Sequence, residues 1–292
     1  MAALKVGDSG DAVRRVQEIL VSKGYMIGTI DGKFGPRTKH AVMTFQARNG
    51  LTPDGVVGVR TLLTLRESKN PIGRELEGRG QTIIPMAEQM PFKMKTKGKY
   101  SKGYPKGAVV HFDASHWKTD DNTRNVMKYG KDKGYAYLEI CYSGRILQAH
   151  PVNEWGNHGG VSGWKGLVGN VSDDLIGIEM ANPGKLELKN GRYVSWYGES
   201  IPGTLVRHVT EAEYGCPTGY YMKYSEEQEK SLIKLLIWLK LNDPYGVFSF
   251  DNTVGHHECA GKLGIGYFRK PDPGGALSVP MPKLREILKK SV

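Results

Sequence analysis

The stretch Val109-Val110-His111-Phe112-Asp113 is an apolar run that delivers a histidine near its end. Residues 254–258 (VGHHE) repeat this pattern. In residues 270–274 (KPDPG), a turn stiffened by two prolines can hold a carboxylate in a fixed direction. The three stretches are far apart in the sequence, so only a folded sheet would bring them together.

These stretches contain the side-chain types that a catalytic zinc site uses. Such a site takes three protein ligands, usually imidazole or carboxylate, and keeps a fourth position open for water. The ligands would come from distant segments, unlike those of a local motif such as H-E-x-x-H. From spacing alone two interpretations stay open: a zinc site, or histidines that are structural or solvated.

The chain beyond residue 106 has a mixed α/β pattern. Strands of a central sheet are expected at four places: the run ending in His111, residues 137–141, residues 176–179 and residues 247–256. Helices are expected at residues 122–134 and from a capping box at Ser225 to about residue 241. Asn190-Gly191 predicts a hairpin turn in an insertion that extends to about residue 224.

Six features of this region occur in one order: the strand ending in His111, a hairpin at residues 140–146, Trp155-Gly156-Asn157-His158-Gly159-Gly160, Ile176-Gly177-Ile178-Glu179, Gly255-His256, and Lys270-x-Asp272-Pro273-Gly274. Through them residues 106–284 resemble the type 2 N-acetylmuramoyl-L-alanine amidases, the zinc family that includes phage endolysins and bacterial muropeptide amidases. No feature is specific by itself, but their order is. The resemblance implies an α/β catalytic domain with a mixed central sheet flanked by helices.

The resemblance also assigns roles to residues. It implies that Zn²⁺ is bound by His111, His256 and Asp272, the last at a position that some relatives fill with cysteine. It supports Glu179 as the group that takes a proton from water, and Lys270 as the cation beside the substrate carbonyl. Glu179 follows a strongly apolar run, where desolvation is expected to raise its pKa.

Other residues near these motifs are weaker candidates. His158, in the glycine-rich loop, and Trp155 are expected to contact the substrate, although a structural role stays open for both. His257 is expected to face away from the metal, on a strand next to His256. Cys259 is a further candidate ligand, but it follows the strand in a turn and fits the pattern less well than Asp272.

One position departs from the pattern of some phage members, which carry a catalytic tyrosine eight residues before the hairpin glycine. In this chain that position is Ala136. Tyr135 and Tyr137 flank it and are expected to point to the opposite face of a strand. We therefore expect Glu179 to fill the role of the tyrosine.

The first 65 residues contain an internal repeat, D-G-x-x-G-x-R-T at residues 31–38 and again at 54–61. In each copy Asp-Gly makes a tight turn before a helix. Helices are expected at residues 11–23, 37–49 and 60–65. This small three-helix pattern resembles the type 1 peptidoglycan-binding domain, with glycan contacts in the groove between the two turns. A dimerisation or regulatory module is the alternative.

Between this peptidoglycan-binding domain (residues 1–65) and the catalytic domain (residues 106–292) we expect a lysine-rich linker at residues 66–105. Residues 1–106 carry 19 basic and 9 acidic side chains, whereas residues 107–292 carry 22 and 21. The lysine run is either a solvated tether or a segment attracted to an anionic envelope surface. No nucleic-acid recognition motif accompanies it, so nucleic acid is not an expected partner.

Composition is ordinary for a soluble globular protein: 39% of the 292 residues are apolar and the mean hydropathy is −0.43. The longest apolar stretch, residues 232–241, is too short to span a bilayer. The N-terminus shows no secretory signal pattern. Three cysteines without paired spacing suggest folding in a reducing compartment without disulfides.

We expect a monomeric, modular hydrolase that recognises the glycan strand and peptide stem of peptidoglycan and cleaves between N-acetylmuramic acid and L-alanine. The missing signal fits a phage or prophage endolysin that is made in the cytoplasm and acts on the cell wall after release. A secretion-system effector or a remodelling amidase of the same chemistry stays an alternative. A recognition protein without catalysis is another, although such relatives typically lose a zinc ligand.

Overall fold

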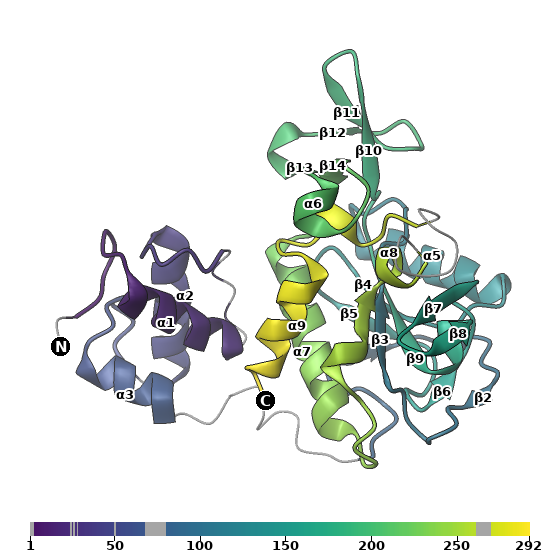
Figure 1. Ribbon diagram of the computed structural model, residues 1–292, viewed down its shortest axis with the longest axis horizontal. Coiled ribbons are helices and arrows are strands. Elements are labelled where there is room, and N and C mark those ends of the chain that lie inside the picture. The colour runs from purple at the N-terminus through teal and green to yellow at the C-terminus, as the bar shows by residue number, and fades with distance from the viewer. Residues whose placement is uncertain are drawn as a thin grey trace.

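The structure, a computed structural model, describes residues 3–292 except residues 24, 26, 28, 50, 68–79 and 261–269. It consists of three N-terminal helices and an α/β domain that is described from residue 80 onward (Figure 1). This confirms the predicted fold class, a mixed sheet flanked by helices beside a small three-helix domain. None of the helices in the described ranges combines the length and apolar character that a membrane span requires.

The N-terminal domain is a three-helix unit with its own core. Its helices are α1 (Asp11–Ser22), α2 (Pro36–Arg48) and α3 (Val59–Glu67). Their apolar faces bury Val16, Leu20 and Phe45 together. The bounds agree with the expected helices to within two residues. The glycines expected to end α1 and α2, Gly24 and Gly50, lie outside the described residues.

The duplicated turn of this domain has a cause that the sequence pattern did not reveal. Gln17, buried in α1, accepts the N–H of Gly32 at 2.8 Å and donates its amide to Asp31 Oδ1 and to the Lys33 carbonyl, both at 3.0 Å. One repeat later, Gln46 in α2 makes the same three kinds of bond with Gly55, Asp54 and Val56. Each Asp-Gly turn is therefore folded around one buried glutamine.

The α/β domain is built on a six-stranded mixed sheet of order β1–β5–β4–β9–β3–β15. Strands β4 and β5 are antiparallel, and the other neighbouring pairs are parallel. The strands are β1 (Ala87–Gln89), β3 (Gly107–Val110), β4 (Leu138–Ile140), β5 (Ile146–Gln148), β9 (Leu175–Met180) and β15 (Thr253–Gly255). The predicted hairpin at residues 140–146 is the β4–β5 connection. The strand predicted at residues 247–256 is confined to β15.

Helices cover both faces of this sheet. On one face α7 (Glu226–Asn242) and α9 (Met281–Lys289) pack in the main core, and α5 (Asp120–Asp132) packs on the other. Because side chains alternate along a strand, β3 buries Val110 in the main core and turns Val109 and His111 to the opposite face. The predicted capping box opens α7, since the Ser225 hydroxyl accepts the Gln228 N–H at 3.0 Å.

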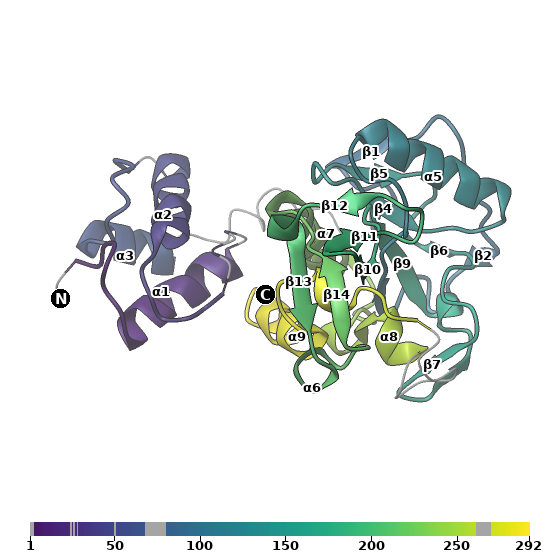
Figure 2. The ribbon, with the colours of Figure 1, turned by 90° about the horizontal axis from the view of Figure 1, so that it is seen from above.

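An antiparallel five-stranded sheet of order β12–β11–β10–β14–β13 projects from this domain (Figures 1 and 2). It comprises β10 (Lys185–Lys189), β11 (Arg192–Val194), β12 (Ser200–Ile201), β13 (Val206–Val209) and β14 (Gly219–Met222), with α6 (Glu211–Tyr214). The predicted Asn190-Gly191 turn joins β10 to β11 with positive φ at both residues. Shorter elements complete the domain: β2 (Gly98–Lys99), β6 (Glu154–Trp155), β7 (Ser162–Trp164), β8 (Leu167–Gly169), α8 (His256–Cys259), η1 (Val171–Asp173), η2 (Gly203–Leu205), η3 (Phe250–Asn252) and η4 (Gly274–Ala276).

The lysine-rich segment corrects the sequence-based prediction of a linker. From residue 80 onward this segment is part of the α/β domain, because β1 pairs with β5 and β2 pairs with β6. Ile84, Tyr100 and Tyr104 are buried in the main core. The lysines between them alternate with inward-facing side chains and therefore lie on the surface of a folded segment. Residues 68–79 lie outside the described residues.

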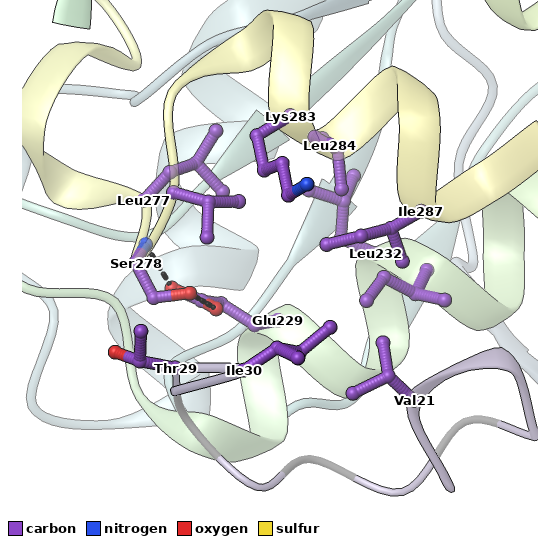
Figure 3. Close-up of a pocket in the computed structure, with 12 residues that line it drawn as sticks. Val21, Thr29, Ile30, Glu229, Leu232, Leu277, Ser278, Lys283, Leu284 and Ile287 are labelled. Carbon is purple, nitrogen blue, oxygen red and sulfur yellow. Dashed lines mark hydrogen bonds between the residues drawn. The ribbon is translucent and has the colours of Figure 1, made fainter. Parts of the chain in front are cut away.

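The two parts of the protein touch along α9 and the start of α7. Ile287 of α9 packs against the N-terminal core, and Arg37 Nε lies 3.7 Å from Glu226 Oε1. A cavity of about 140 Å³ remains between the parts (Figure 3). Its apolar lining comes from both sides: Val21 and Ile30 face Leu232, Leu277, Leu284 and Ile287.

Candidate active site

The three polar stretches of the sequence meet at one end of the six-stranded sheet. His111 follows β3, His256 begins α8 directly after the neighbouring parallel strand β15, and Asp272 lies shortly before η4. His111 Nδ1 is 2.9 Å from His256 Nδ1 and 3.0 Å from Asp272 Oδ2, and His256 Nδ1 is 2.9 Å from the same oxygen. All three side chains are buried.

The protons of these histidines are assigned from the hydrogen-bond partners of the outer ring nitrogens. His256 Nε2 is 3.0 Å from the carbonyl oxygen of Gly159, so this nitrogen carries the proton. His158 Nε2 donates to the Leu175 carbonyl at 2.8 Å, which leaves His158 Nδ1 to accept from His111 Nε2 at 3.1 Å. Both inner Nδ1 atoms therefore present a lone pair to the carboxylate.

The pKa of His111 agrees with the neutral ring assigned to it. Burial, and then the neighbouring His256, lower the pKa of His111 to about 4, so its ring is neutral at pH 7. Burial opposes ionisation of Asp272, but contacts with His256 and His111 outweigh it and lower the pKa of this carboxyl. Three acceptor atoms that carry no proton between them repel one another in a buried site. A cation among them removes the repulsion, and two imidazoles with one carboxylate are donors that suit zinc.

A cavity of about 540 Å³ opens beside this cluster and brings the predicted catalytic pair together. Glu179, on β9, lines it with Oε1 3.9 Å from His111 Nδ1. Its Oε2 is buried and has no hydrogen-bond partner among the described residues. Burial, and then the charges of Asp272 and Asp113, raise the pKa of Glu179, as the apolar run before it led us to expect. Lys270 lines the same cavity.

The expectation that the flanking tyrosines point away from the site is wrong. Tyr135 and Tyr137 both line the cavity, whereas Ala136 packs in a small core with Met127. Alternation still groups the two tyrosines apart from Ala136. The error lay in the face assigned to the site, because the cavity is on the side of the tyrosines.

The weaker candidates separate clearly in the structure. His158 lines the cavity and also fixes the ring of His111. Trp155 instead packs against the main core, with Lys97 Nζ 5.9 Å from the centre of its ring, and it does not line this cavity. His257 lies outside the three-residue cluster, and its Nδ1 is 3.0 Å from the backbone carbonyl of Asp272. The strand expected at this position is wrong, because the segment is helical from His256 on. Cys259 is buried outside the three-residue cluster.

Sequence reasoning missed several residues that support the backbone segments carrying the candidate ligands. The hydroxyl of Tyr224 donates to the His111 carbonyl at 2.9 Å. Asp113 accepts the N–H of Asn182 at 2.9 Å and so fixes the loop after His111. Arg207 donates to the Gly275 carbonyl at 2.9 Å, beside the turn that carries Asp272. They lie in or next to the insertion, and no local sequence pattern signals such long-range contacts.

Two family models match the chain. The N-acetylmuramoyl-L-alanine amidase model matches residues 101–275, and a peptidoglycan-binding domain model matches residues 9–65. The N-acetylmuramoyl-L-alanine amidase CwlM of Mycobacterium tuberculosis is 41% identical over 56 residues, 19% of this chain and 14% of that protein. The zinc D-Ala-D-Ala carboxypeptidase of Streptomyces albus G is 51% identical over 63 residues, 20% of this chain and 24% of that protein. The chain thus spans less than a quarter of the length of either relative.

Two solved structures align with most of the chain at low identity. A selenomethionine derivative of AmpD is 18% identical and covers 72% of this chain and 98% of its own, with a TM-score of 0.44. The amidase AmiD from E. coli, in complex with anhydro-N-acetylmuramic acid-L-Ala-D-gamma-Glu-L-Lys, is 20% identical and covers 70% of this chain and 65% of its own. Its TM-score is 0.43.

Proposed function

This chain belongs to the N-acetylmuramoyl-L-alanine amidase family, and we propose that it hydrolyses the amide bond between N-acetylmuramic acid and L-alanine in peptidoglycan. One observation carries the proposal. The inner Nδ1 atoms of His111 and His256 and the carboxylate of Asp272 face one another within 3.0 Å in a buried cluster. A cation held among these three side chains would account for the arrangement.

The three residues would hold Zn²⁺. When bound, this ion supplies a positive charge that polarises the amide carbonyl and lowers the pKa of water. His158 and the Gly159 carbonyl keep the inner nitrogens of the two histidines unprotonated, and so ready to bind. Of the three candidate ligands, His111 and His256 directly follow neighbouring strands of the sheet, which favours a fixed geometry.

Glu179 and Lys270 supply the proton transfer and the charge stabilisation. In the proposed reaction the oxygen of water forms a bond with the amide carbon while Glu179 takes the water's proton. The Glu179 carboxyl then gives this proton to the leaving amine of L-alanine as the C–N bond breaks. Lys270, in the same cavity, stabilises the negative charge that develops on the carbonyl oxygen. No other proton donor or acceptor is required for the balance.

The N-terminal domain would hold the enzyme on its substrate. Its match to the peptidoglycan-binding family supports this role. A hollow of about 420 Å³ beside the second repeat turn, lined by Asp54, Arg60 and Thr61 among others, is a candidate surface for glycan. The binding residues stay a prediction, as does attraction of the surface lysines at residues 93–99 to an anionic envelope.

We further propose that the biological setting is lysis by a phage or prophage endolysin. The pairing of a wall-binding domain with an amidase domain is consistent with this role. It is equally consistent with other enzymes that attack intact wall, such as a secretion-system effector or a remodelling amidase. Neighbouring genes separate these roles, because a holin gene favours lysis and an immunity gene favours an effector. A recognition protein without catalysis is disfavoured by the complete set of donor side chains at the candidate zinc site.

Incubation of the full-length protein with purified sacculi tests the reaction. Mass spectrometry should find free N-terminal L-alanine peptides and glycan chains with free lactyl groups. The purified protein should contain about one zinc per chain, chelation should abolish release, and added zinc should restore it. Asp272→Ala should lose both zinc and activity. Cleavage of a different bond, or full activity of metal-free protein, would contradict the proposal.

A further inference from the structure

A cluster of aromatic rings lies on the insertion, outside the proposed catalytic centre. Trp196 and Tyr197 occupy the turn between β11 and β12, and His116 comes from the loop between β3 and α5. The ring centres of His116 and Tyr197 are 4.3 Å apart, and those of Trp196 and Tyr197 are 5.5 Å apart. The projecting β10–β12 strands that carry this turn are visible in Figures 1 and 2. None of the three rings lines the catalytic cavity or belongs to the neighbouring apolar cluster around Leu186 and Ile201.

Trp196 is highly exposed and yet held in place. Its side chain is 72% exposed, more than any other large apolar side chain among the described residues. Its Nε1–H donates to the carbonyl oxygen of Ala114 at 2.6 Å, and the neighbouring Tyr197 hydroxyl donates to the Ser115 carbonyl at 3.0 Å. Since the polar edge of the indole is already bonded to the protein, what it offers to solvent is an immobilised apolar face.

The backbone that accepts these bonds is itself constrained. Ala114 has φ +53°, a left-handed conformation that is uncommon for a residue with a side chain. Asp113 holds the same loop by accepting from Ser115 and Asn182. Strained backbone of this kind persists where the surroundings enforce it, and it gathers at catalytic and ligand-binding sites. Ala114 is three residues from His111, so its Cα lies within about 11 Å of that of the zinc-ligand candidate.

Charged groups border the aromatic cluster. Glu199 pairs with Lys118 at 2.5 Å and lies 4.0 Å from His116 Nδ1. A flat aromatic face with hydrogen-bonding groups at its edge suits a pyranose ring, which has an apolar C–H face and hydroxyl groups around its rim. It suits a peptide stem less well, because contact with a single rigid aromatic face gives a flexible peptide little binding free energy.

We propose that Trp196, together with Tyr197 and His116, is a subsite for an N-acetylhexosamine ring of the peptidoglycan glycan strand. The inference rests on the proposed function, since it assigns the glycan part of that substrate to the insertion. It gives the insertion a second role beside supporting the ligand loops. The rigid bond to Ala114 couples this subsite to the loop that follows His111, so a bound sugar would be positioned relative to the catalytic cavity.

The test is binding of a glycan that contains no peptide. The probe is the tetramer of β-1,4-linked N-acetylglucosamine, added to the full-length protein and followed by the indole N–H signals in NMR. All five tryptophans lie at residue 117 or later, so sugar bound by the N-terminal domain does not disturb these signals directly. We expect the Trp196 signal, assigned with Trp196→Phe, to shift most. Trp196→Ala should weaken the binding reported by the other indoles about five- to tenfold.

Two comparisons separate a sugar contact from a structural role. Tyr129→Ala removes another exposed aromatic, 61% exposed on α5, and should leave sugar binding unchanged. In cleavage assays Trp196→Ala should raise KM for long glycan chains about five- to tenfold, with kcat within about twofold and zinc content unchanged. A fall in zinc content or kcat with unchanged sugar binding would show a merely structural role and overturn the proposal.

The binding assay requires no cleavage, so its result is independent of the proposed function. If the protein binds the sugar through Trp196 but does not release L-alanine peptides, the amidase proposal is contradicted and the subsite proposal stands. If the protein cleaves sacculi but the sugar does not shift the Trp196 signal, the subsite proposal is overturned and the amidase proposal stands.

Discussion

Protonation is decided residue by residue at the candidate zinc site. The Leu175 carbonyl accepts a hydrogen bond from His158, and His158 accepts one from His111. The tautomer of His158 therefore fixes the tautomer of His111. The carbonyl of Gly159 does the same for His256. Outer partners of this kind orient metal ligands and raise their basicity. His158, expected from the sequence to contact substrate, therefore also has a clear role in holding His111.

Substitutions at Glu179 and Lys270 test the division of roles at the same scale. Glu179→Gln is nearly isosteric but cannot take a proton, so turnover should fall by roughly 10²–10⁴-fold with zinc retained. Lys270→Ala should cost on the order of 10²–10³-fold, mostly in kcat. The measurement is zinc content beside kcat on soluble muropeptide for each variant.

Glu139→Gln is the matched control for Glu179→Gln. Glu139 is opposite Glu179 on the neighbouring strand β4 and is fully buried, but it does not line the catalytic cavity. Glu139→Gln should change kcat only a few-fold, because burial raises the pKa of this carboxyl and already favours its neutral form. If Glu179→Gln keeps near-normal turnover, the proton acceptor lies elsewhere, and Tyr135 or Tyr137, which line the same cavity, become the next candidates.

At the scale of elements, one buried side chain organises each repeat of the N-terminal domain. Gln17 in α1 and Gln46 in α2 each satisfy the backbone and the aspartate of the turn that follows. The glycines of these turns, Gly32 and Gly55, have φ of +71° and +73°, which other residues adopt only with strain. The repeated D-G is thus one half of a structural unit whose other half is a glutamine on a preceding helix.

Gln46→Ala should destabilise the N-terminal domain by about 2–4 kcal/mol, because it leaves buried partners of the second turn unsatisfied. Gln17→Ala should cost a similar amount, since its bonds have the same geometry. Hydrogen-exchange mass spectrometry on the full chain should show faster exchange in peptides from residues 29–61. The exchange rate of peptides from α7 should not change. Arg15→Ala, at an exposed position of α1, is the control and should change little. Unchanged exchange in both glutamine variants would contradict the role given to these side chains.

At the scale of the whole molecule, the two parts meet at several described places. These include the packing of Ile287, the contact between Arg37 and Glu226, and an apolar cavity that is not completely filled. Each part has its own core. An interface of this kind allows the wall-binding domain and the catalytic domain to act as separate units.

Truncation tests this independence and the position of the boundary. A variant of residues 80–292 should fold, bind zinc and cleave soluble muropeptide, with weaker binding to sacculi. A variant that starts at residue 106 loses β1 and the buried Ile84, Tyr100 and Tyr104, so it should be unfolded or aggregated. Circular dichroism and zinc content distinguish the two. Folding of both variants would restore the originally predicted boundary.

The sequence by itself indicated the fold class and the repeat, and it pointed to the three stretches that meet at the candidate zinc site. These follow from local patterns: apolar runs that end in His111 and His256, a proline-stiffened turn at Asp272, and a duplicated D-G motif. Periodicity and turn chemistry act over a few residues, so they can be recognised without a structure. The family resemblance then gave these residues an order and a function.

Only the tertiary structure decided how the site is supported. It placed the lysine-rich segment in the sheet, turned Tyr135 and Tyr137 into the cavity, and removed Trp155 from it. It also brought Tyr224 to the backbone of His111 and fixed Trp196 on Ala114, across 113 and 82 residues of chain. Such contacts depend on where a strand begins and on which distant segments pack together. Those choices are made by burial of the whole core, which no local pattern contains.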